Sequence, residues 1–110
     1  LMLSFGGSIE TARRLIPLGA YFSISGFFLH DRKSSVLEVF RQIPADRILM
    51  ETDAPDMLPL DDRITHPLPE KRNHPANLPV IGHAVASKLG MKPGEFAAMT
   101  AENSRRCFGF

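Results

Sequence analysis

The chain has 110 residues, a formal net charge of +1, and 44% apolar and 23% charged residues. These values are ordinary for one globular domain, large enough to bury a core but small for an α/β enzyme. The low net charge excludes a strong overall electrostatic attraction to nucleic acid or anionic membranes. The sequence has no stretch of about 18 consecutive apolar residues, which a membrane-spanning helix would need.

The chain has a single cysteine, Cys107, which rules out an internal disulfide. One free thiol suits a reducing compartment, and Cys107 is interpreted as a small packing residue in a terminal helix. The N-terminus shows no charged region followed by a cleavage site. These features together predict a cytoplasmic protein.

The N-terminal part of the chain predicts one strand and one helix. Leu1 to Ser4 is typical of a buried strand, and Gly6-Gly7-Ser8 supplies a tight turn with Ser8 as the N-cap. Apolar residues at helical spacing then predict a helix over residues 9 to 18, which Gly19 ends. The Gly-Gly-Ser turn could hold an anion, but no lysine follows it, so we interpret it as a plain turn.

A second strand and helix follow. Residues 21 to 25 alternate in the β manner, with the hydroxyls of Ser23 and Ser25 on one face, as expected for a barrel interior or a substrate-facing wall. Residues 35 to 43 predict a helix, which Pro44 stops. The segment around His30, between these two elements, shows no clear period.

A third strand is predicted over residues 48 to 52, because the apolar run 48–50 is typical of a strand buried on both faces of a parallel sheet. Pro55 disfavours a helical residue before it, so Asp53 is expected at or just beyond the carboxyl edge of the strand. Ligands and catalytic groups lie at this edge in α/β sheets and barrels. An alternative is that Asp53 only caps the next element. Glu51 is expected to pair with an arginine.

The next segment, residues 54 to 79, contains six of the nine prolines and predicts a long irregular loop. Loops of this length are usually functional or disordered. Arg72 could contact a substrate phosphate. The alternative is that it is only a solvated charge in the loop. His66 and His74 each precede a proline and show no metal-chelating spacing.

The remaining residues predict three helices. The first runs over residues 79 to 89 and is closed by Gly90. A short one begins at Pro93, and a final one restarts at Thr100 or Ala101. The final helix has three expected packing anchors: Asn103, Arg106 and Phe108.

Five motifs occur in one order over nearly the whole chain: Ser4-Phe5-Gly6-Gly7-Ser8, Phe22-Ser23-Ile24-Ser25-Gly26, Ile43-Pro44-Ala45-Asp46-Arg47-Ile48-Leu49-Met50-Glu51-Thr52-Asp53-Ala54-Pro55, Arg72-Asn73-His74-Pro75-Ala76-Asn77, and Thr100-Ala101-Glu102-Asn103-Ser104-Arg105-Arg106-Cys107-Phe108. This set resembles the TatD family of metal-dependent hydrolases, which belong to the amidohydrolase-like TIM barrels. The Glu-Thr-Asp-Ala-Pro element followed by Arg-Asn-x-Pro is the specific part.

The resemblance implies an α/β fold in which residues 1–110 form a single partial domain, the C-terminal three or so β/α units of a TIM barrel of about 250 residues. It implies a deoxyribonuclease that hydrolyses phosphodiester bonds in DNA with water activated by Mg²⁺, Mn²⁺ or Zn²⁺. Asp53 matches the family's terminal metal-binding aspartate, which accepts a proton from the attacking water. Arg72 and Asn73 are the candidate substrate contacts.

One position departs from the family pattern. A metal-binding histidine should directly precede the Ser-Phe-Gly-Gly-Ser turn, and Leu3 stands there, through either a replacement or a deletion. Leu3 favours one alternative, a truncated, non-catalytic remnant of the family. A second alternative is a small doubly wound α/β binding domain, in which Asp53 would be a strand-end acidic site. The isolated chain is expected to be inactive. Ile48 and Met50 are expected to face water or another chain, so the chain should associate with itself or with a missing N-terminal half.

Overall fold

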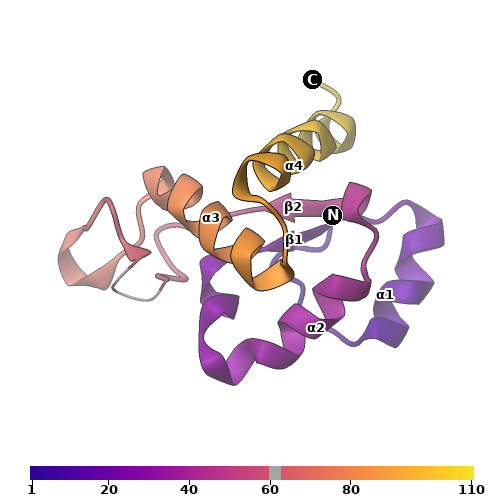
Figure 1. The fold of residues 1–110 in the computed structure, drawn as a ribbon, viewed down its shortest axis with the longest axis horizontal. Coiled ribbons are helices and arrows are strands. Elements are labelled where there is room, and N and C mark those ends of the chain that lie inside the picture. The colour runs from indigo at the N-terminus through magenta and orange to yellow at the C-terminus, as the bar shows by residue number, and fades with distance from the viewer. Residues whose placement is uncertain (60–62) are drawn as a thin grey trace.

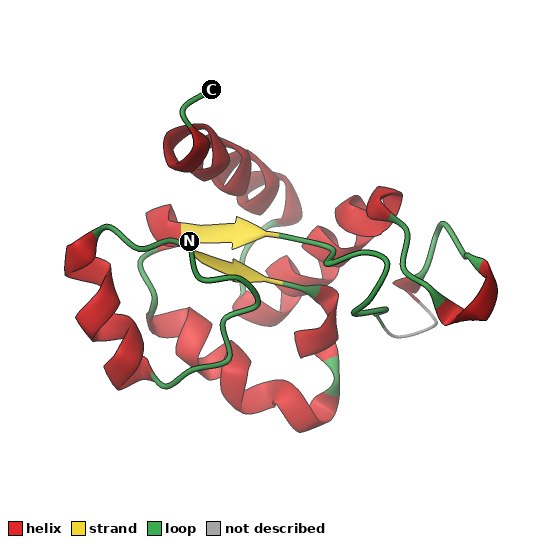
Figure 2. Ribbon diagram, turned by 180° about the vertical axis from the view of Figure 1, so that it is seen from behind, coloured by secondary structure: helices red, strands yellow, loops and turns green. Residues whose placement is uncertain are grey.

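The computed structural model describes residues 1–59 and 63–110. Residues 60–62, which belong to the predicted loop 54–79, lie outside the described residues. At the centre, strand β1 (Phe22–Ile24) pairs in parallel with strand β2 (Ile48–Met50), with Phe22 opposite Ile48 and Ile24 opposite Met50. Figure 2 shows the two strands side by side, pointing the same way. The predicted parallel pairing is confirmed, with each strand shorter than predicted.

The expected first strand over residues 1–4 is wrong, since only Met2 pairs there, through one parallel bridge to Phe22. The Met2 N–H donates to the Tyr21 carbonyl at 2.8 Å, and the Ser23 N–H donates to the Met2 carbonyl at 3.0 Å. The chain then turns at Ser4, whose φ of 42° is incompatible with an extended strand. The spatial order is therefore Met2, β1, β2.

Two helices precede β2. Helix α1 (Ile9–Leu15) continues as a 3-10 turn over Ile16–Leu18 and ends at Gly19, whose φ is +82°. Ser8 caps it as predicted, because its hydroxyl accepts the Thr11 N–H at 3.2 Å. Helix α2 (Ser34–Gln42) agrees within one residue at each end with the prediction. Figure 1 shows α1 and α2 on the same side of the strands, away from α4.

The segment around His30 forms two 3-10 helices, over Gly26–Leu29 and Asp31–Lys33. Gly26 lets Pro59, in the loop after β2, and Ile81, in a later helix, approach the end of β1 closely. A Cβ added at Gly26 would lie 3.0 Å from the Pro59 Cβ and 3.1 Å from the Ile81 Cγ1. A larger residue at Gly26 would therefore push both neighbours outward.

Two helices follow the loop. Helix α3 (Leu78–Leu89) ends at Gly90 as predicted. Helix α4 (Pro93–Phe108) is continuous, so the prediction of a separate final helix beginning at Thr100 or Ala101 is wrong. The Thr100 hydroxyl donates to the Phe96 carbonyl at 3.0 Å, which satisfies it inside the helix. Within residues 1–59 and 63–110, no helix is long and apolar enough to cross a membrane.

The core lies between the strands and the helices and includes large side chains that are at most 1% exposed: Phe22, Ile24, Phe40, Ile81, Val85 and Phe96. Ile48 is also buried, at 3% exposure, so the expectation that it faces water is wrong. Helix α4 packs against β2. Met50 is half-buried and lines a groove between α3 and α4.

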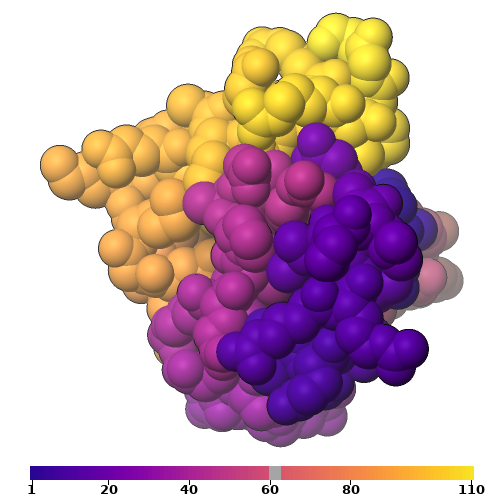
Figure 3. Space-filling model, turned by 90° about the vertical axis from the view of Figure 1, so that its right-hand side faces the viewer, coloured from indigo at the N-terminus to yellow at the C-terminus, as the bar shows by residue number. Residues whose placement is uncertain are grey.

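Asn103 connects α4 to β2 as an anchor, as predicted. It is fully buried, and its amide nitrogen donates at 2.8 Å to the carbonyls of Ala45 and Ile48, while Arg106 donates to its amide oxygen. Phe108 is 57% exposed and is not an anchor, since α4 has passed the sheet at that point. Figure 3 shows the C-terminal end of α4, in yellow, projecting from the body of the molecule.

We expect Asn103→Ala to lower the free energy of unfolding by about 1 to 3 kcal/mol, because the buried Ile48 carbonyl would lose its partner. Urea denaturation at one fixed protein concentration measures the change. The matched control is Glu102→Ala on the exposed face of the same helix, expected to stay within about 0.5 kcal/mol. Equal effects of the two substitutions would contradict the bridging role of Asn103.

Candidate active site

Asp53 lies just beyond the carboxyl end of β2, where the sequence places it. The Glu51 N–H still donates to the Ile24 carbonyl at 3.1 Å, so the sheet pairing continues one residue past the strand. Asp53 itself is exposed, has φ +55°, and begins a turn in which the Asp56 N–H donates to its carbonyl at 2.9 Å. Aspartate tolerates this left-handed conformation better than most residues. The carboxylate is therefore presented to solvent at the edge where catalytic groups gather in such folds.

Glu51 contacts serine hydroxyls instead of the expected arginine. Its carboxylate accepts from the Ser23 hydroxyl at 2.5 Å and from the Ser4 hydroxyl. The ion pairs of residues 1–59 and 63–110 involve other carboxylates. Glu51 thus ties the N-terminal turn and β1 to the end of β2, with each of its two oxygens accepting from one serine hydroxyl.

The described residues of this chain do not form a metal site by themselves. In the described part of the chain, no group of three or more His, Cys, Asp or Glu residues could hold a metal ion. Leu3 is 68% exposed and carries no donor atom. Catalytic metal sites usually use three or more protein ligands. Asp53 offers one free carboxylate, so any metal would need ligands from beyond the described residues.

Asn73 holds the loop onto the strand end. It is 1% exposed, and its amide nitrogen donates to the carbonyls of Thr52 at 2.9 Å and Met57 at 3.3 Å. Its own N–H donates to the Pro55 carbonyl at 2.7 Å. Both amide hydrogens of Asn73 therefore bond the protein and hold the turn that carries Asp53. A contact between Asn73 and a substrate stays a prediction.

Arg72 is exposed beside Asn73, with its Nε 3.9 Å from a Glu70 carboxylate oxygen. Exposed pairs of this kind contribute little to stability. The guanidinium therefore remains able to exchange this contact for another anion. Its role as a substrate contact stays a prediction.

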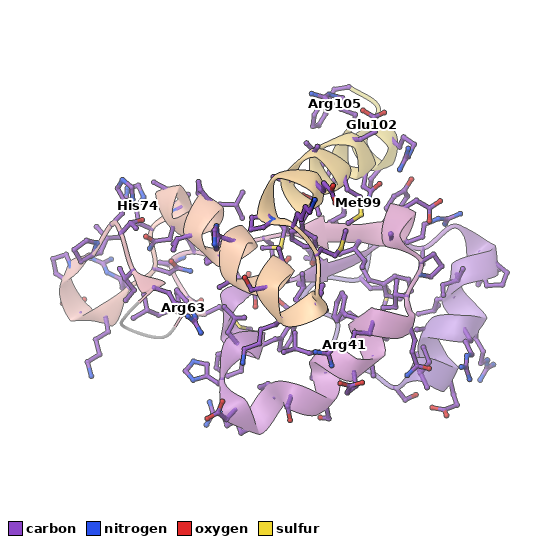
Figure 4. All side chains as sticks on the ribbon, in the orientation of Figure 1. Arg41, Arg63, His74, Met99, Glu102 and Arg105 are labelled. Atoms are coloured by element: carbon purple, nitrogen blue, oxygen red, sulfur yellow. The ribbon has the colours of Figure 1, made fainter. Side chains whose placement is uncertain are left out.

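His66 and His74 form a pair that the sequence did not indicate. Their ring centroids lie 5.5 Å apart with an angle of 26° between the planes. Figure 4 places His74 at the outer edge of the molecule, beside the start of α3. A separation of eight positions in an irregular loop carries no helical or strand period, so the sequence held no signal for the contact.

The fold and the site together define an α/β protein with parallel strands and an exposed carboxylate at the carboxyl edge of its last strand. The family described as TatD related DNase matches residues 1–109. The chain belongs to this family. Membership confirms the resemblance. It argues against the alternative that the chain is a small doubly wound binding domain.

Two curated relatives illustrate the similarity. The chain is 42% identical over 105 residues to the "3'-5' ssDNA/RNA exonuclease TatD" of Erwinia tasmaniensis, covering 94% of the chain and 40% of that protein. It is 34% identical over 108 residues to the "Uncharacterized metal-dependent hydrolase YabD" of Bacillus subtilis, covering 98% of the chain and 40% of that protein. The chain thus spans about 40% of the length of these relatives.

Solved structures agree on the fold. A TatD family hydrolase from Entamoeba histolytica superimposes with a TM-score of 0.76 at 21% identity, over 94% of the chain and 40% of that structure. The TatD homologue YjjV from Escherichia coli superimposes with a TM-score of 0.74 at 25% identity, over 92% of the chain and 37% of that structure. The described α/β arrangement therefore matches part of a larger fold.

Proposed function

We propose that this chain forms the C-terminal three or so β/α units of a TIM-barrel hydrolase of the TatD family, which hydrolyses phosphodiester bonds in DNA with metal-activated water. The observation that carries the proposal is Asp53, an exposed carboxylate at the carboxyl edge of β2, in a chain that matches the family over residues 1–109. The names of the two relatives, an exonuclease and a metal-dependent hydrolase, support the same activity.

Asp53 is the proposed catalytic residue of this part of the enzyme. Its exposed carboxylate would take up a proton from the attacking water and would contribute one oxygen ligand to a divalent ion, Mg²⁺, Mn²⁺ or Zn²⁺. The other ligands would come from residues outside this chain. Arg72, exposed on the loop that Asn73 fixes to the strand end, would contact a substrate phosphate. We place this activity in the cytoplasm.

Leu3 supports a second candidate, a remnant of the family that no longer hydrolyses DNA. An aliphatic side chain at the position where the family carries a metal-binding histidine removes one ligand. Loss of residues that only orient metal ligands already costs about 10- to 100-fold in affinity or activity. The loss of a ligand itself should cost no less.

A chimera separates the two candidates. Residues 1–110 would replace the matched 40% of the Erwinia tasmaniensis relative, and cleavage of labelled DNA would be followed with Mg²⁺ or Mn²⁺ and with EDTA. We expect cleavage that EDTA abolishes, and a gain of at least about 10-fold from Leu3→His. The control is Leu1→His, two positions away and also exposed. A folded chimera that is inactive with Leu3 in place would contradict the proposed function and favour the remnant, and rescue by Leu3→His would identify the lost ligand as the cause.

A further inference from the structure

The loop beside Asp53 presents a preorganised pair of imidazole rings. His66 and His74 stack with ring centroids 5.5 Å apart, and His66 is exposed whereas His74 is half-buried. His74 lies against one side of the His66 ring. Because His66 is exposed, much of its side chain remains accessible to solvent.

Hydrogen bonds to the buried Asn77 hold His66 in this orientation. The Asn77 amide oxygen accepts the N–H groups of His66 at 2.8 Å and Thr65 at 3.2 Å, and its amide nitrogen lies 3.3 Å from the His66 carbonyl. The His66 Nδ1 lies 3.0 Å from the Thr65 hydroxyl. Asn77 is itself fixed, since its amide nitrogen donates to the Asn73 amide oxygen at 3.0 Å. The backbone of His66 is therefore fixed before any ligand arrives, and the Thr65 hydroxyl and His74 contact its ring.

The pair is not a metal site. The His74 Nδ1 accepts the Ala76 N–H at 2.9 Å, so the ring proton of neutral His74 is on Nε2. A protonated nitrogen has no lone pair for a metal, and using Nε2 as a ligand would require breaking the contact with Ala76. What His74 offers outward is an N–H donor.

The surroundings of the pair favour a polyanion that carries aromatic groups. Lys71 and Arg72 are exposed in the same loop, directly before Asn73 and His74. Basic side chains attract phosphates, and flat rings stack on the bases of single strands, whose faces are exposed. Asn73 keeps this loop at the end of β2, because its amide nitrogen lies 2.9 Å from the Thr52 carbonyl.

We infer that the exposed ring of His66 is a stacking platform for a base of single-stranded nucleic acid, beside the strand end that carries Asp53. The inference deepens the proposed function and rests on it, since it assigns a base contact to the same site. His74 supports the platform from beneath. Lys71 and Arg72 attract the neighbouring phosphates.

The test measures binding instead of cleavage. Fluorescence anisotropy would follow the 110-residue chain binding a labelled oligothymidylate of about twelve nucleotides, a length within the usual site size of single-strand binders. EDTA would be present throughout, so that neither metal nor hydrolysis contributes. The variants are His66→Ala and His66→Phe, with His83→Ala on the exposed surface of α3 as the matched control. Far-UV circular dichroism would show that each variant is folded.

We expect His66→Ala to weaken binding about 5- to 10-fold, at the lower end of base stacking on aromatic side chains because imidazole is small. His66→Phe should bind at least as well as the unchanged chain, and His83→Ala should match it. An abasic oligonucleotide of equal length should show no effect of His66→Ala. Equal weakening on the abasic strand, loss of binding in His66→Phe, or no binding by the unchanged chain would overturn the inference. Failure of the chimera to cleave DNA would leave this result standing, so the two proposals fail separately.

Discussion

Replacing Asp53 by asparagine in the active chimera is expected to lower metal-dependent DNA cleavage at least about 100-fold. The amide is nearly the same size as the carboxylate but cannot take up a proton at neutral pH. General base catalysis contributes about 10² to 10⁴ to the rate. The amide also lacks the negative charge that hard divalent cations prefer in their ligands.

The fold should tolerate this change. Asp53 is exposed, and the turn it begins is closed through its backbone carbonyl, 2.9 Å from the Asp56 nitrogen, and not through its side chain. Asparagine also accepts the positive φ of this position. The midpoint of thermal unfolding without metal should therefore stay unchanged within error.

Asp56→Asn is the matched control for this experiment. It removes a carboxylate from the same exposed turn, three residues further along the chain, and should leave cleavage within about 2-fold of the unchanged chimera, as expected of a surface substitution. Initial cleavage rates at saturating Mg²⁺ or Mn²⁺ would be compared. Full activity in the Asp53→Asn chimera, or an equal loss in both variants, would show that the carboxylate of Asp53 has no special role.

The second large effect concerns the 110-residue chain alone, which we expect to show no Mg²⁺- or Mn²⁺-dependent DNA cleavage above a buffer control. One free carboxylate cannot hold a catalytic ion in a defined geometry. The same chain should retain the weak nucleic acid binding expected of the His66 platform. Cleavage by the isolated chain that Asp53→Asn abolishes would mean that the described residues form a complete site after all.

The isolated chain is also expected to associate with itself, because its apolar surface is only partly covered. A groove of about 380 Å³ lies between α3 and α4 and is lined by Met50, Leu78 and Phe96 among others. Leu1, Leu18, Phe108 and Phe110 are more than half exposed. Burying an apolar side chain of this size is worth roughly 1.5 to 3 kcal/mol, so a few such contacts favour a dimer or larger species at micromolar concentration.

Two alanines on α4 provide a matched pair of variants for this prediction. Ala97 lines the groove and Ala98 does not, and both are exposed. Ala97→Glu places a charge in the apolar groove and should shift the mass measured by light scattering toward the monomer. Ala98→Glu should leave it unchanged. A monodisperse monomer for the unchanged chain would contradict the prediction.

Features that depend on only a few neighbouring residues could be predicted from the sequence. Ser8, Gly19 and Gly90 mark helix ends through capping and left-handed backbone geometry, which involve partners within about four positions. The apolar run of β2 followed by Pro55 locates Asp53 at the strand edge in the same way. The motifs that identify the family are likewise read along the chain.

The tertiary structure alone decided the contacts between distant segments. Asn103 meets Ile48 across 55 positions, Asn73 meets Thr52 across 21, and Glu51 meets Ser23 across 28. No local rule selects such partners, because each depends on how helices and loops pack around β2 and on which buried polar groups need satisfying. For the same reason, the burial of Asn73 and its bonds to the strand end could not be predicted from its place in the motif. The His66 and His74 stack is equally invisible along the chain, since folding of the loop around Asn77 brings the two rings together.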